Sequence, residues 1–468
     1  MINKKPNLTE LVLRDGQQSL IATRMSIKDM IPILPKLNKV GYESIEVWGG
    51  ATYDCCLRYL NEDPWVRLSI FKKYFKNTKL QMLLRGQNIV GYKRYDDSVL
   101  EIFINNSAKK GIDIFRSFDS LNDINNIDKS ITYINKTGKH SQGTMAYTTS
   151  PIHDNKYWLK FAKKIEDVGA KSLAIKDMAG LLRPYAAYDL IKLLKKNMKI
   201  PIFLHSHATT GLSDATNIKA YEAGIDNLDA SISSFSGTYG HTATESLISM
   251  IYQNDENPYD MNLLNEINVY FSKLREKYKN FEGSLKGIDT TMLYNQVPGG
   301  MLSNLERQLK DLDQEDKFKQ LIDEIPNIRA DLGYVPLVTP TSQIVGTQAL
   351  MNILDGERYK NLTNEMIDLV TGKYGKIPGK ISNKLLKIAE KKADNQDCEA
   401  EKTIEIYKKD FKDICINNDL SNLYKNETDL LNYILFPDVA VNYYIERKNA
   451  SDNEVFDLQE SLGFIIPD

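Results

Sequence analysis

Ile202-Phe203-Leu204-His205-Ser206-His207 is an apolar run that ends in two histidines one residue apart. A run of this kind directly after Pro201 is typical of a buried strand. Because side chains alternate along a strand, both imidazoles point to the same face. Two neutral imidazoles aimed one way form a ligand pair for a borderline transition metal. The alternative is two polar residues that cap a strand at the rim of a barrel.

The same unit, a short apolar run with a polar end followed by an amphipathic helix, fills the chain from residue 8 to about residue 240. The runs are 8–13, 44–48, 80–84, 112–115, 143–147, 172–175, 202–204 and 228–232. Helical patterns such as 98–110, 156–168 and 214–223 lie between them, and glycines follow helices at 41, 111, 169 and 224. This alternation predicts the α/β class and a TIM (β/α)8 barrel, with a doubly wound open sheet as the lesser alternative.

Polar residues follow each apolar run. They are Arg14-Asp15-Gly16-Gln17-Gln18, Gly49-Gly50-Ala51-Thr52-Tyr53-Asp54, Arg85-Gly86-Gln87-Asn88, Ser117-Phe118-Asp119, Thr148-Thr149, Lys176-Asp177-Met178, His205-Ser206-His207 and Ser233-Ser234. In a barrel these ends meet at one mouth, which is where active sites of this fold are built. We therefore expect them to form one site.

Helical periodicity replaces strand-like runs after about residue 285. The candidate helices are 305–312, 317–325, 342–354 and 385–393. Residues 397–413 are rich in charge with spaced apolar positions at Ile404, Tyr407 and Phe411, which indicates an exposed helix that packs one face. We expect two domains, a barrel over residues 1–285 that carries the metal site and a mainly helical C-terminal domain over residues 286–468.

Composition excludes several classes of protein. A net charge of −2 offers no broad basic surface for nucleic acid. The four cysteines, Cys55, Cys56, Cys398 and Cys415, form no C-x-x-C pair and suggest no disulfide framework. The chain begins without an apolar signal region, and no apolar stretch reaches the roughly 18 residues of a spanning helix. We expect a cytoplasmic protein that reaches a membrane only through partner subunits.

Asp15, His205 and His207 supply one carboxylate and two imidazoles for a divalent cation. Lys176 is puzzling beside a metal, since an ammonium has no lone pair and repels a cation. Carbamylation by carbon dioxide would convert it into an anionic oxygen ligand. The alternative is that Lys176 pairs with Asp177 or another carboxylate.

Several long motifs resemble the carboxyltransferase domain of biotin-dependent enzymes. They are Leu13-Arg14-Asp15-Gly16-Gln17-Gln18-Ser19, Trp48-Gly49-Gly50-Ala51-Thr52-Tyr53-Asp54, Leu84-Arg85-Gly86-Gln87-Asn88, Ile175-Lys176-Asp177-Met178-Ala179-Gly180, Leu204-His205-Ser206-His207, Thr238-Tyr239-Gly240-His241, Gln296-Val297-Pro298-Gly299-Gly300 and Val338-Thr339-Pro340-Thr341-Ser342-Gln343. The resemblance runs from residue 8 to about 380. It is strongest to the oxaloacetate decarboxylase α subunit, and it extends to the pyruvate carboxylase B-subunit and the large transcarboxylase subunit.

The resemblance implies a barrel with a helical domain that forms a funnel over its mouth. It places the metal ligands on Asp15, carbamylated Lys176, His205 and His207. Zinc suits this set best, although manganese or cobalt would also fit.

The resemblance also assigns the substrate pocket. Arg85 would hold the carboxylate of a keto acid with its guanidinium fork, and Gln18 would donate to the carbonyl. The alternatives are an ion pair at the barrel rim and a surface amide. Tyr92 would support this pocket, or else it is a core aromatic with a satisfied hydroxyl.

For catalysis, the resemblance makes Thr339 the proton shuttle between a biotin nitrogen and the methyl carbon of enolpyruvate. A hydroxyl can both donate and accept, as such a shuttle requires. The alternative is a loop residue that Pro340 restrains. Ser342 and Asp54 fall where the family contacts or admits biotin.

The implied activity is biotin-dependent carboxyl transfer from oxaloacetate, an oxaloacetate decarboxylase (lyase) reaction that gives pyruvate. The metal would stabilise the enolate that remains when the carboxyl group leaves. Running in reverse, as a pyruvate carboxylase B-subunit or a transcarboxylase subunit, the same site would carboxylate pyruvate.

The expected partners follow from a departure from the family pattern. Relatives often carry a biotinyl domain after a Pro/Ala-rich linker, whereas this sequence ends at Phe464-Ile465-Ile466-Pro467-Asp468 without one. We expect biotin on a separate carrier protein, or else on a domain of a longer chain of which this sequence is a part. We also expect partner subunits of the membrane decarboxylase or biotin carboxylase type, and a homodimer.

Two remoter functions stay open. Acyl-CoA Claisen synthases and lyases share Arg14-Asp15-Gly16 and His205-Ser206-His207, but not Lys176-Asp177-Met178. The second remote function is that of a non-catalytic scaffold subunit. Retention of the candidate site residues argues against it.

Overall fold

The computed structural model describes residues 4–252, 256–297, 305–306, 308–393, 402–420 and 423–449. Some predictions concern residues outside these ranges. They are the Pro298-Gly299-Gly300 part of a motif, residue 307 of one candidate helix, Cys398, residues 397–401 of the charge-rich stretch, and the last part of the C-terminal domain.

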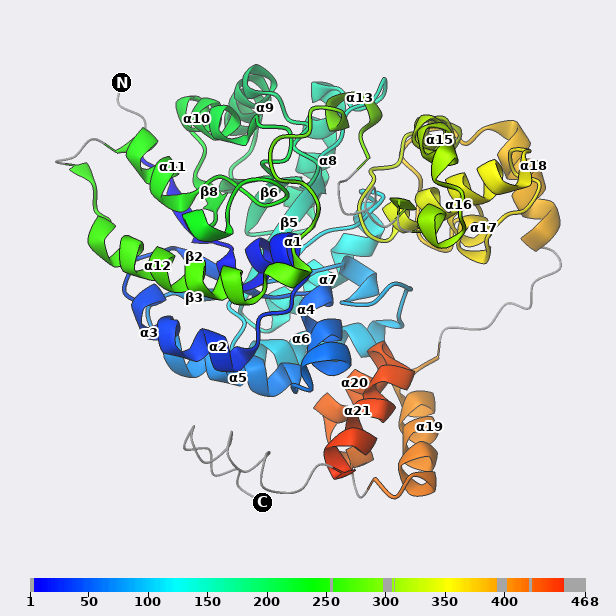
Figure 1. The fold of residues 1–468 in the computed structure, drawn as a ribbon, viewed down its shortest axis with the longest axis horizontal. Helices are drawn as coiled ribbons and strands as arrows, with labels where there is room; N and C mark the ends of the chain where they lie inside the picture. The colour runs from blue at the N-terminus through cyan, green and yellow to red at the C-terminus, as the bar shows by residue number, and fades with distance from the viewer. Residues whose placement is uncertain are drawn as a thin grey trace.

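Eight parallel strands form a closed barrel in chain order (Figure 1). They are β1 (Asn7–Glu10), β2 (Ser44–Trp48), β3 (Lys79–Leu84), β4 (Ile114–Ser117), β5 (His140–Ala146), β6 (Ser172–Asp177), β7 (Ile202–Ser206) and β8 (Asn227–Ala230). The barrel closes where β1 pairs with β8, from Asn7 opposite Asn227 to Glu10 opposite Ala230. This confirms the predicted TIM barrel and excludes the open sheet.

The helices between the strands, and two that follow β8, surround the barrel. They are α1 (Gln17–Ile21), α2 (Ile27–Met30), α3 (Leu34–Leu37), α4 (Gly50–Cys55), α5 (Pro64–Tyr74), α6 (Asp97–Lys110), α7 (Ile124–Lys136), α8 (Asn155–Asp167), α9 (Pro184–Asn197), α10 (Ser213–Ala223), α11 (Thr244–Ile251) and α12 (Met261–Lys277). The predicted glycine caps at 41, 111, 169 and 224 all have positive φ. Among the described residues, no helix is both long and apolar enough to span a membrane.

The first strand is shorter than the sequence predicts. We expected a strand over residues 8–13, but β1 ends at Glu10 and a π-helix, η1 (Val12–Gly16), follows. The amide of its last residue donates to the carbonyl of Leu11 at 2.9 Å. Asp15 therefore lies on a helical turn beyond the strand and not at the strand's end.

The physical reason for this early end is the buried Glu10 carboxylate. Its Oε1 accepts from the backbone amides of Leu11, Val12 and Ile232 at 3.1, 3.0 and 3.0 Å. Its Oε2 accepts from the Thr244 hydroxyl at 2.8 Å. The Leu11 amide still donates to the carbonyl of Ala230 at 2.9 Å. Because the carboxylate takes the amides of Val12 and Ile232, pairing stops there and the chain turns over the barrel mouth.

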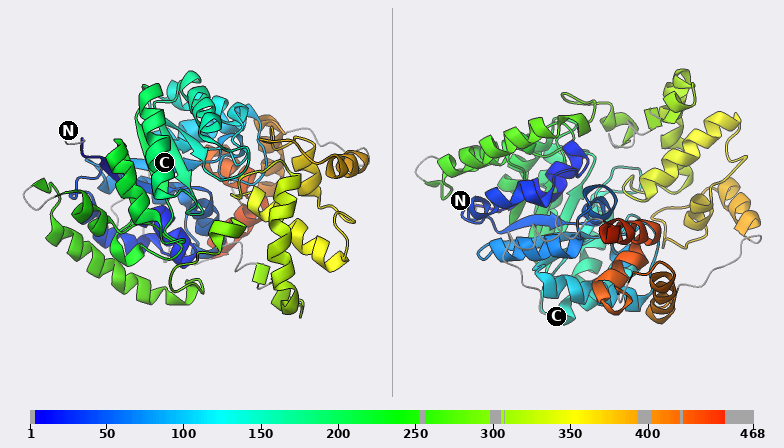
Figure 2. Two further views of the ribbon diagram at one scale, coloured as in Figure 1. Left: turned by 90° about the horizontal axis from the view of Figure 1, so that it is seen from above. Right: turned by 60° about the horizontal axis from the view of Figure 1, so that its bottom comes forward.

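The helices after residue 285 divide into two groups, seen from two further sides in Figure 2. The first is α13 (Met292–Asn295), α15 (Phe318–Asp331), α16 (Thr341–Asp355), α17 (Asn364–Val370) and α18 (Asn383–Ala393), and the second is α19 (Ile404–Asn417), α20 (Glu427–Leu435) and α21 (Pro437–Asn449). Helices α15–α18, which we call the helical lobe, have an apolar core of their own. Helices α19–α21 share the barrel's core instead, through residues such as Phe411, Tyr433 and Tyr444.

Candidate active site

A cavity of about 680 Å³ lies between the mouth of the barrel and helix α16. The barrel contributes Arg14, Asp15, Gln18, Arg85, Lys176 and His207, and the helical lobe contributes Val338, Thr339, Ser342, Gln343 and Thr347. Chain segments more than 300 residues apart thus build one chamber, and most of the predicted site residues face it.

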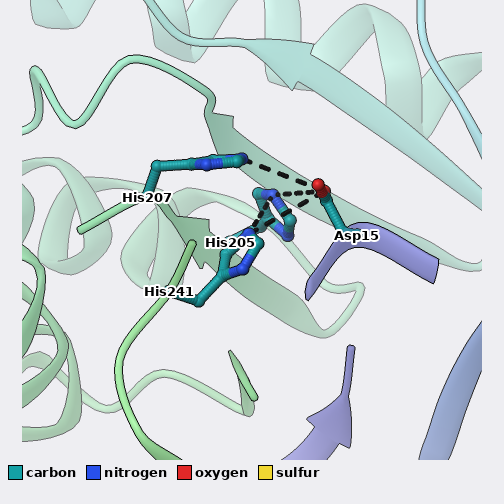
Figure 3. Close-up of side chains that lie close together, drawn as sticks. All are labelled: Asp15, His205, His207 and His241. Carbon is teal, nitrogen blue, oxygen red and sulfur yellow. Dashed lines mark hydrogen bonds and ion pairs between the residues drawn. The ribbon is translucent and has the colours of Figure 1, made fainter. Parts of the chain in front are cut away.

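At the floor of this cavity and beneath it, three imidazoles converge on one carboxylate (Figure 3). Asp15 and His207 line the cavity, whereas His205 and His241 are fully buried behind them. The residues are Asp15, His205, His207 and His241, and one potential ligand atom from each lies within 4.8 Å of all the others. Asp15 Oδ2 is 3.2, 3.9 and 3.8 Å from the Nε2 atoms of His205, His207 and His241. All four residues are buried, as a site that excludes bulk water requires.

Two of these imidazoles are held in orientation by hydrogen bonds from their Nδ1 atoms. His205 Nδ1 donates to Asp229 Oδ2 at 2.8 Å, and Arg116 pairs with the same carboxylate inside the barrel. His207 Nδ1 donates to the carbonyl oxygen of Tyr239 at 2.8 Å. With the proton on Nδ1 in each ring, both Nε2 lone pairs point toward Asp15, which is the arrangement of metal-binding histidines.

His207 and His241 are held neutral by their surroundings. Burial lowers the pKa of His207 to about 3 and holds the pKa of His241 well below its usual range. A protonated imidazole has no lone pair to offer, so these environments favour the form that binds a cation.

Lys176 reaches the same centre from β6. Its Nζ lies 2.8 Å from His205 Nε2 and 3.3 Å from Asp15 Oδ2, and the side chain is buried. Burial lowers the pKa of this amine. Of the two partners considered from the sequence, Asp177 is not the one, because its carboxylate accepts from backbone amides after β6.

Asp15 is ionised despite its position. Burial alone would raise its pKa, but the Arg14 guanidinium at 2.8 Å and the Lys176 ammonium hold that pKa well below its usual range. Arg14 also pairs with Glu46 at 2.5 Å, so its orientation is fixed by a second carboxylate on β2. The floor of the cavity therefore presents an anionic oxygen beside neutral nitrogens.

Arg85 and Gln18 stand beside this floor. Arg85 Nη1 donates to the carbonyls of Val90 and Gly91 at 3.1 and 3.0 Å, which fixes the plane of the guanidinium. A side chain at Gly50 would come within 2.8 Å of that guanidinium, so only glycine allows this close approach. Gln18 Oε1 accepts from Arg14 at 3.2 Å, which leaves its NH₂ group as the donor for a ligand.

Three predicted residues lie outside the cavity lining, and they are the fully buried His205, Tyr92 and Asp54. Tyr92 is 46% exposed and lies with its ring 5.0 Å from the Arg85 guanidinium, so the alternative of a core aromatic is wrong. Asp54 pairs with Arg58 on its own helical segment at 2.9 Å.

Thr339 and Ser342 enter the cavity from the start of α16. The Thr339 hydroxyl lies 3.4 Å from Gln343 Nε2, and the peptide bond between Thr339 and Pro340 is cis. Ser342 is anchored by its amide, which donates to the carbonyl of Val338 at 2.9 Å. These hydroxyls belong to the lobe, whereas the imidazoles and Asp15 belong to the barrel.

Comparison with known proteins places this geometry in a family. A family model described as a conserved carboxylase domain matches residues 292–463, and one described as HMGL-like matches residues 100–276. The chain is 47% identical over 443 residues to the pyruvate carboxylase B-subunit of Methanocaldococcus jannaschii, with 93% of this chain and 77% of the relative covered. The chain belongs to the biotin-dependent carboxyltransferases.

Two further relatives agree with this assignment. The methylmalonyl-CoA carboxyltransferase 5S subunit of Propionibacterium freudenreichii is 44% identical over 453 residues, with 95% of this chain and 88% of the relative covered. The carboxyl transferase domain of Rhizobium etli pyruvate carboxylase with pyruvate superposes with a TM-score of 0.89 at 31% identity, with 97% of this chain and 79% of that chain covered. This carboxyltransferase is accordingly an enzyme of the pyruvate carboxylase and transcarboxylase type, and the family resemblance seen in its motifs is confirmed.

One residue of the cluster was not assigned a role from the sequence. His241 lies after β8, in the loop that follows Gly237, and its ring is fully buried beside His205 and His207. The sequence did contain it within the Thr238-Tyr239-Gly240-His241 motif, which is one of the motifs that carry the family resemblance. This histidine has no second histidine near it in sequence, so its spacing gave no reason to suspect a ligand.

Proposed function

We propose that this carboxyltransferase moves a carboxyl group between biotin on a separate carrier protein and the pyruvate/oxaloacetate pair. The observation that carries the proposal is the cavity floor, where the Asp15 carboxylate and the His207 imidazole are exposed to the cavity with an arginine fork and an amide donor beside them. A 2-oxo acid needs one group for its carboxylate and a polarising centre for its keto oxygen, and the cavity offers both.

The donor set fits a divalent transition metal. Asp15, His205 and His207 would hold it, with Lys176 as a carbamate, and zinc or cobalt suits a site of mixed imidazole and oxygen ligands. The contacts support a cation here, because the Asp15 oxygen and the His205 Nε2 lone pair face one another at 3.2 Å. Bound there, the ion would supply a Lewis acid for the keto oxygen and for the negative charge that develops as the carboxyl group leaves.

The residues of the chain divide the remaining tasks. Arg85 is placed to bind the substrate carboxylate in a fixed plane, and Gln18 to donate to the keto oxygen. Tyr92 supports Arg85 by stacking and does not itself line the cavity. These groups orient the substrate so that its methyl or methylene carbon faces the lobe.

Thr339 is the proposed proton carrier. Its hydroxyl lines the cavity on the lobe side and can pass a proton between a biotin nitrogen and the substrate carbon. Ser342 lines the same wall and would contact biotin, which would supply the ureido nitrogen that carries the carboxyl group. Asp54, paired with Arg58 away from the lining, has the weakest support.

Two directions of the reaction are candidates. The similarity to the pyruvate carboxylase B-subunit favours carboxylation of pyruvate, with a biotin carboxylase subunit as partner. The Asp15-Gly16 and Arg85-Gly86-Gln87-Asn88 motifs favour the oxaloacetate decarboxylase α type. Since one site catalyses both directions, the subunit that loads or unloads the biotin sets the physiological one.

The test is isotope exchange by the purified, metal-loaded protein, measured as incorporation of carbon-labelled pyruvate into oxaloacetate with and without a biotinylated carrier. Spontaneous and free-metal decarboxylation of oxaloacetate is measured in parallel and subtracted. We expect exchange that depends on biotin and disappears when avidin sequesters it. Exchange that is no faster with the carrier, in protein whose metal content is verified, would refute the proposal.

A further inference from the structure

We propose that the N-terminal end of the barrel, opposite the active-site cavity, binds directly to an anionic lipid surface. The inference goes beyond the proposed function, because no residue of the cavity takes part in it. It also departs from the expectation drawn from the sequence, in which only partner subunits reach a membrane.

Lysines gather at this end of the barrel. Because the eight strands are parallel, the segments that lead from the end of a helix into the next strand all meet here. We call six neighbouring segments of this kind the basic face, and they run from α3, α5, α6, α7, α8 and α9 into β2, β3, β4, β5, β6 and β7. They cover residues 34–44, 71–79, 107–114, 133–140, 164–172 and 194–202, and their lysines are Lys36, Lys39, Lys72, Lys73, Lys76, Lys79, Lys109, Lys110, Lys136, Lys139, Lys164, Lys171, Lys195, Lys196 and Lys199.

This concentration of lysines is not a result of overall composition. The six segments hold 54 of the 468 residues but 15 of the 47 lysines in the chain, and none of its 13 arginines. Lys72 and Lys139 are half-buried, and the other lysines of the basic face are exposed. Their ammonium groups are therefore available to a partner.

The carboxylates around these lysines do not cancel their charge. Four carboxylates lie in the same segments and three pair with lysines at the rim, and the seven are Glu43, Asp113, Glu166, Asp167, Glu101, Asp226 and Glu266. Fifteen lysines against seven carboxylates leave eight positive charges. Because six helix C-termini offset about half a charge each, an excess of roughly five remains. The net charge of −2 for the whole chain conceals this basic end.

The excess is confined to one side of the barrel end. On the other side, beside α10, α11 and α12, the acidic residues Glu222, Asp226, Glu256 and Asp260 follow one another. Lys5 lies there too, and it pairs with Glu256 at 3.4 Å. The barrel should therefore meet an anionic surface with its β2–β7 side and tilt the α10–α12 side away.

The position of the charge favours an extended surface over a small anion. A hollow of about 430 Å³ at the centre of this end is lined by lysines and carboxylates in equal number, which are Lys4, Lys79, Lys139, Glu43, Asp113 and Asp226. Asp113 pairs there with Lys72 and Lys139 at 2.9 and 2.8 Å. A small ligand binds in a concave site where its partners converge, and this one is balanced in charge. The excess lies around it, on exposed lysines such as Lys109, Lys110 and Lys196.

A layer of lipid headgroups fits the basic face better than a protein partner does. Protein interfaces are centred on apolar and aromatic anchors, and arginine is enriched in them while lysine is depleted. Among the described residues, none of the large exposed apolar side chains lies in the six segments. Lysines near an anionic leaflet bind it by charge alone, so this composition is sufficient for lipid.

Binding at this end would leave the active site accessible. The cavity lies between the barrel mouth and α16, at the C-terminal end of the strands. An enzyme attached by its basic face would present this cavity to the solution, from which a biotinylated carrier reaches it.

The test is co-sedimentation of the purified full chain with vesicles. Vesicles of equal parts phosphatidylglycerol and phosphatidylcholine are compared with pure phosphatidylcholine at about 0.05 M salt, where charges act over more than about 10 Å. We expect binding to the anionic vesicles only, and release at about 1 M salt, where the screening length is about 3 Å. Absence of binding, equal binding to neutral vesicles, or competition by glycerol phosphate at constant ionic strength would overturn the proposal.

Substitution locates the contact. A variant that combines Lys109→Gln, Lys110→Gln and Lys196→Gln removes three exposed charges from the basic face. A lysine near an anionic surface contributes about fivefold to the partition coefficient, so this variant should bind about 100-fold more weakly. The matched control combines Lys360→Gln, Lys384→Gln and Lys387→Gln, which removes the same charge from exposed positions of the helical lobe and should bind like wild type.

Thermal unfolding of both variants should match that of wild type, since all six lysines are exposed. Equal losses in the two variants would show that net charge sets the binding, and undiminished binding by the first variant would contradict the proposal directly. Binding to polyuridylate but not to vesicles would make nucleic acid the partner instead. None of these measurements involves a substrate, so a failure of biotin-dependent exchange would leave this inference standing.

Discussion

Lys176 has two chemical states with opposite effects on the cluster. As an ammonium it donates toward His205 Nε2 at 2.8 Å and neutralises Asp15 at 3.3 Å, so it takes the place of a cation. As a carbamate it would be an anion that binds one. Burial lowers the pKa of the amine, and the neutral amine is the form that reacts with carbon dioxide.

Replacing Lys176 by alanine should lower metal affinity by at least about 10-fold, with a parallel loss of carboxyl exchange, because an oxygen ligand disappears. Metal content after dialysis, measured by elemental analysis, checks this. Lys160→Ala, on the exposed face of α8, is the control. Full metal occupancy in the Lys176 variant would show that the carbamate is not a ligand.

Thr339→Ala should keep its metal but lose biotin-dependent exchange by about 100-fold or more, since a proton carrier contributes that much. Thr339→Ser keeps the hydroxyl and should retain most of the activity. Exchange kinetics and metal content are measured on the same samples. Wild-type exchange in the alanine variant would remove Thr339 from the mechanism.

Some of the candidate site residues could be predicted from the sequence. Asp15, Lys176, His205 and His207 could be predicted because each follows an apolar run and strand ends converge in a barrel. The groups behind them could not, since Arg116 and Asp229 sit inside the strands β4 and β8 and meet His205 only across the barrel. Their charges carry no local pattern that a sequence would reveal.

At the scale of elements, strand ends were harder to predict than strands. Each of the eight apolar runs overlaps an observed strand, because buried parallel strands need continuous apolar residues. Their ends depend on which backbone amides find partners in neighbouring strands. Glu10 illustrates this, as its carboxylate ends β1 and so places Asp15 on the π-turn η1.

The buried Glu10 carboxyl group should make the free energy of unfolding depend on pH. Burial raises the pKa of Glu10 to about 7, above its ordinary value of 4.5. Between these values the folded state holds a proton that the unfolded chain has lost, so the free energy of unfolding falls as pH rises. Glu10→Gln keeps an acceptor for the backbone amides and removes the titration. Its stability relative to wild type should therefore increase by up to about 3 kcal/mol between about pH 5 and about pH 8.

Denaturant unfolding of the two proteins at both pH values measures this difference. The variant Glu43→Gln, whose carboxylate is partly exposed and paired with Lys79, serves as the control. A difference between wild type and Glu10→Gln that does not change with pH would contradict the prediction.

At the scale of the whole molecule, Arg329 fastens the helical lobe to the barrel. From α15 it donates to Thr148 Oγ1 and to the carbonyl of Thr149 beyond β5, at 2.8 and 3.0 Å. It also donates to Gln296 Oε1 at 2.5 Å and to the carbonyl of Val335 at 2.8 Å. One nearly buried guanidinium thus links the helical lobe to the barrel.

Arg329→Met should loosen this attachment by about 3 kcal/mol, because buried acceptors lose a charged donor. Hydrogen exchange should become faster in α15–α18 while the barrel strands and their metal affinity stay unchanged. Arg358→Met is the control, since Arg358 pairs with Glu324 and Asp331 within the lobe. Unaltered exchange in the lobe of the Arg329 variant would argue against a fastening role.

Which core each C-terminal helix joins could not be predicted. In the described part of residues 397–413, the spaced apolar residues correctly indicated a helix with one buried face, formed by Ile404, Tyr407 and Phe411 on α19. An amphipathic pattern shows that a face is covered but not what covers it. Only the structure shows that α19–α21 complete the barrel's core and that α15–α18 have their own.

The packing of α20 against the barrel also has a consequence for folding during translation. Asn432 bonds to Tyr53 and Trp65 at 2.5 and 3.1 Å, and Phe436 stacks on Tyr53, so the aromatic flank around α4 and α5 is covered by residues made late. About 200 residues separate the end of β8 from α20, which a ribosome working at ~5–20 residues per second needs roughly 10 to 40 s to add. Throughout that interval the nascent barrel has all eight strands and an uncovered apolar flank, which is the period in which chaperones protect such surfaces from aggregation.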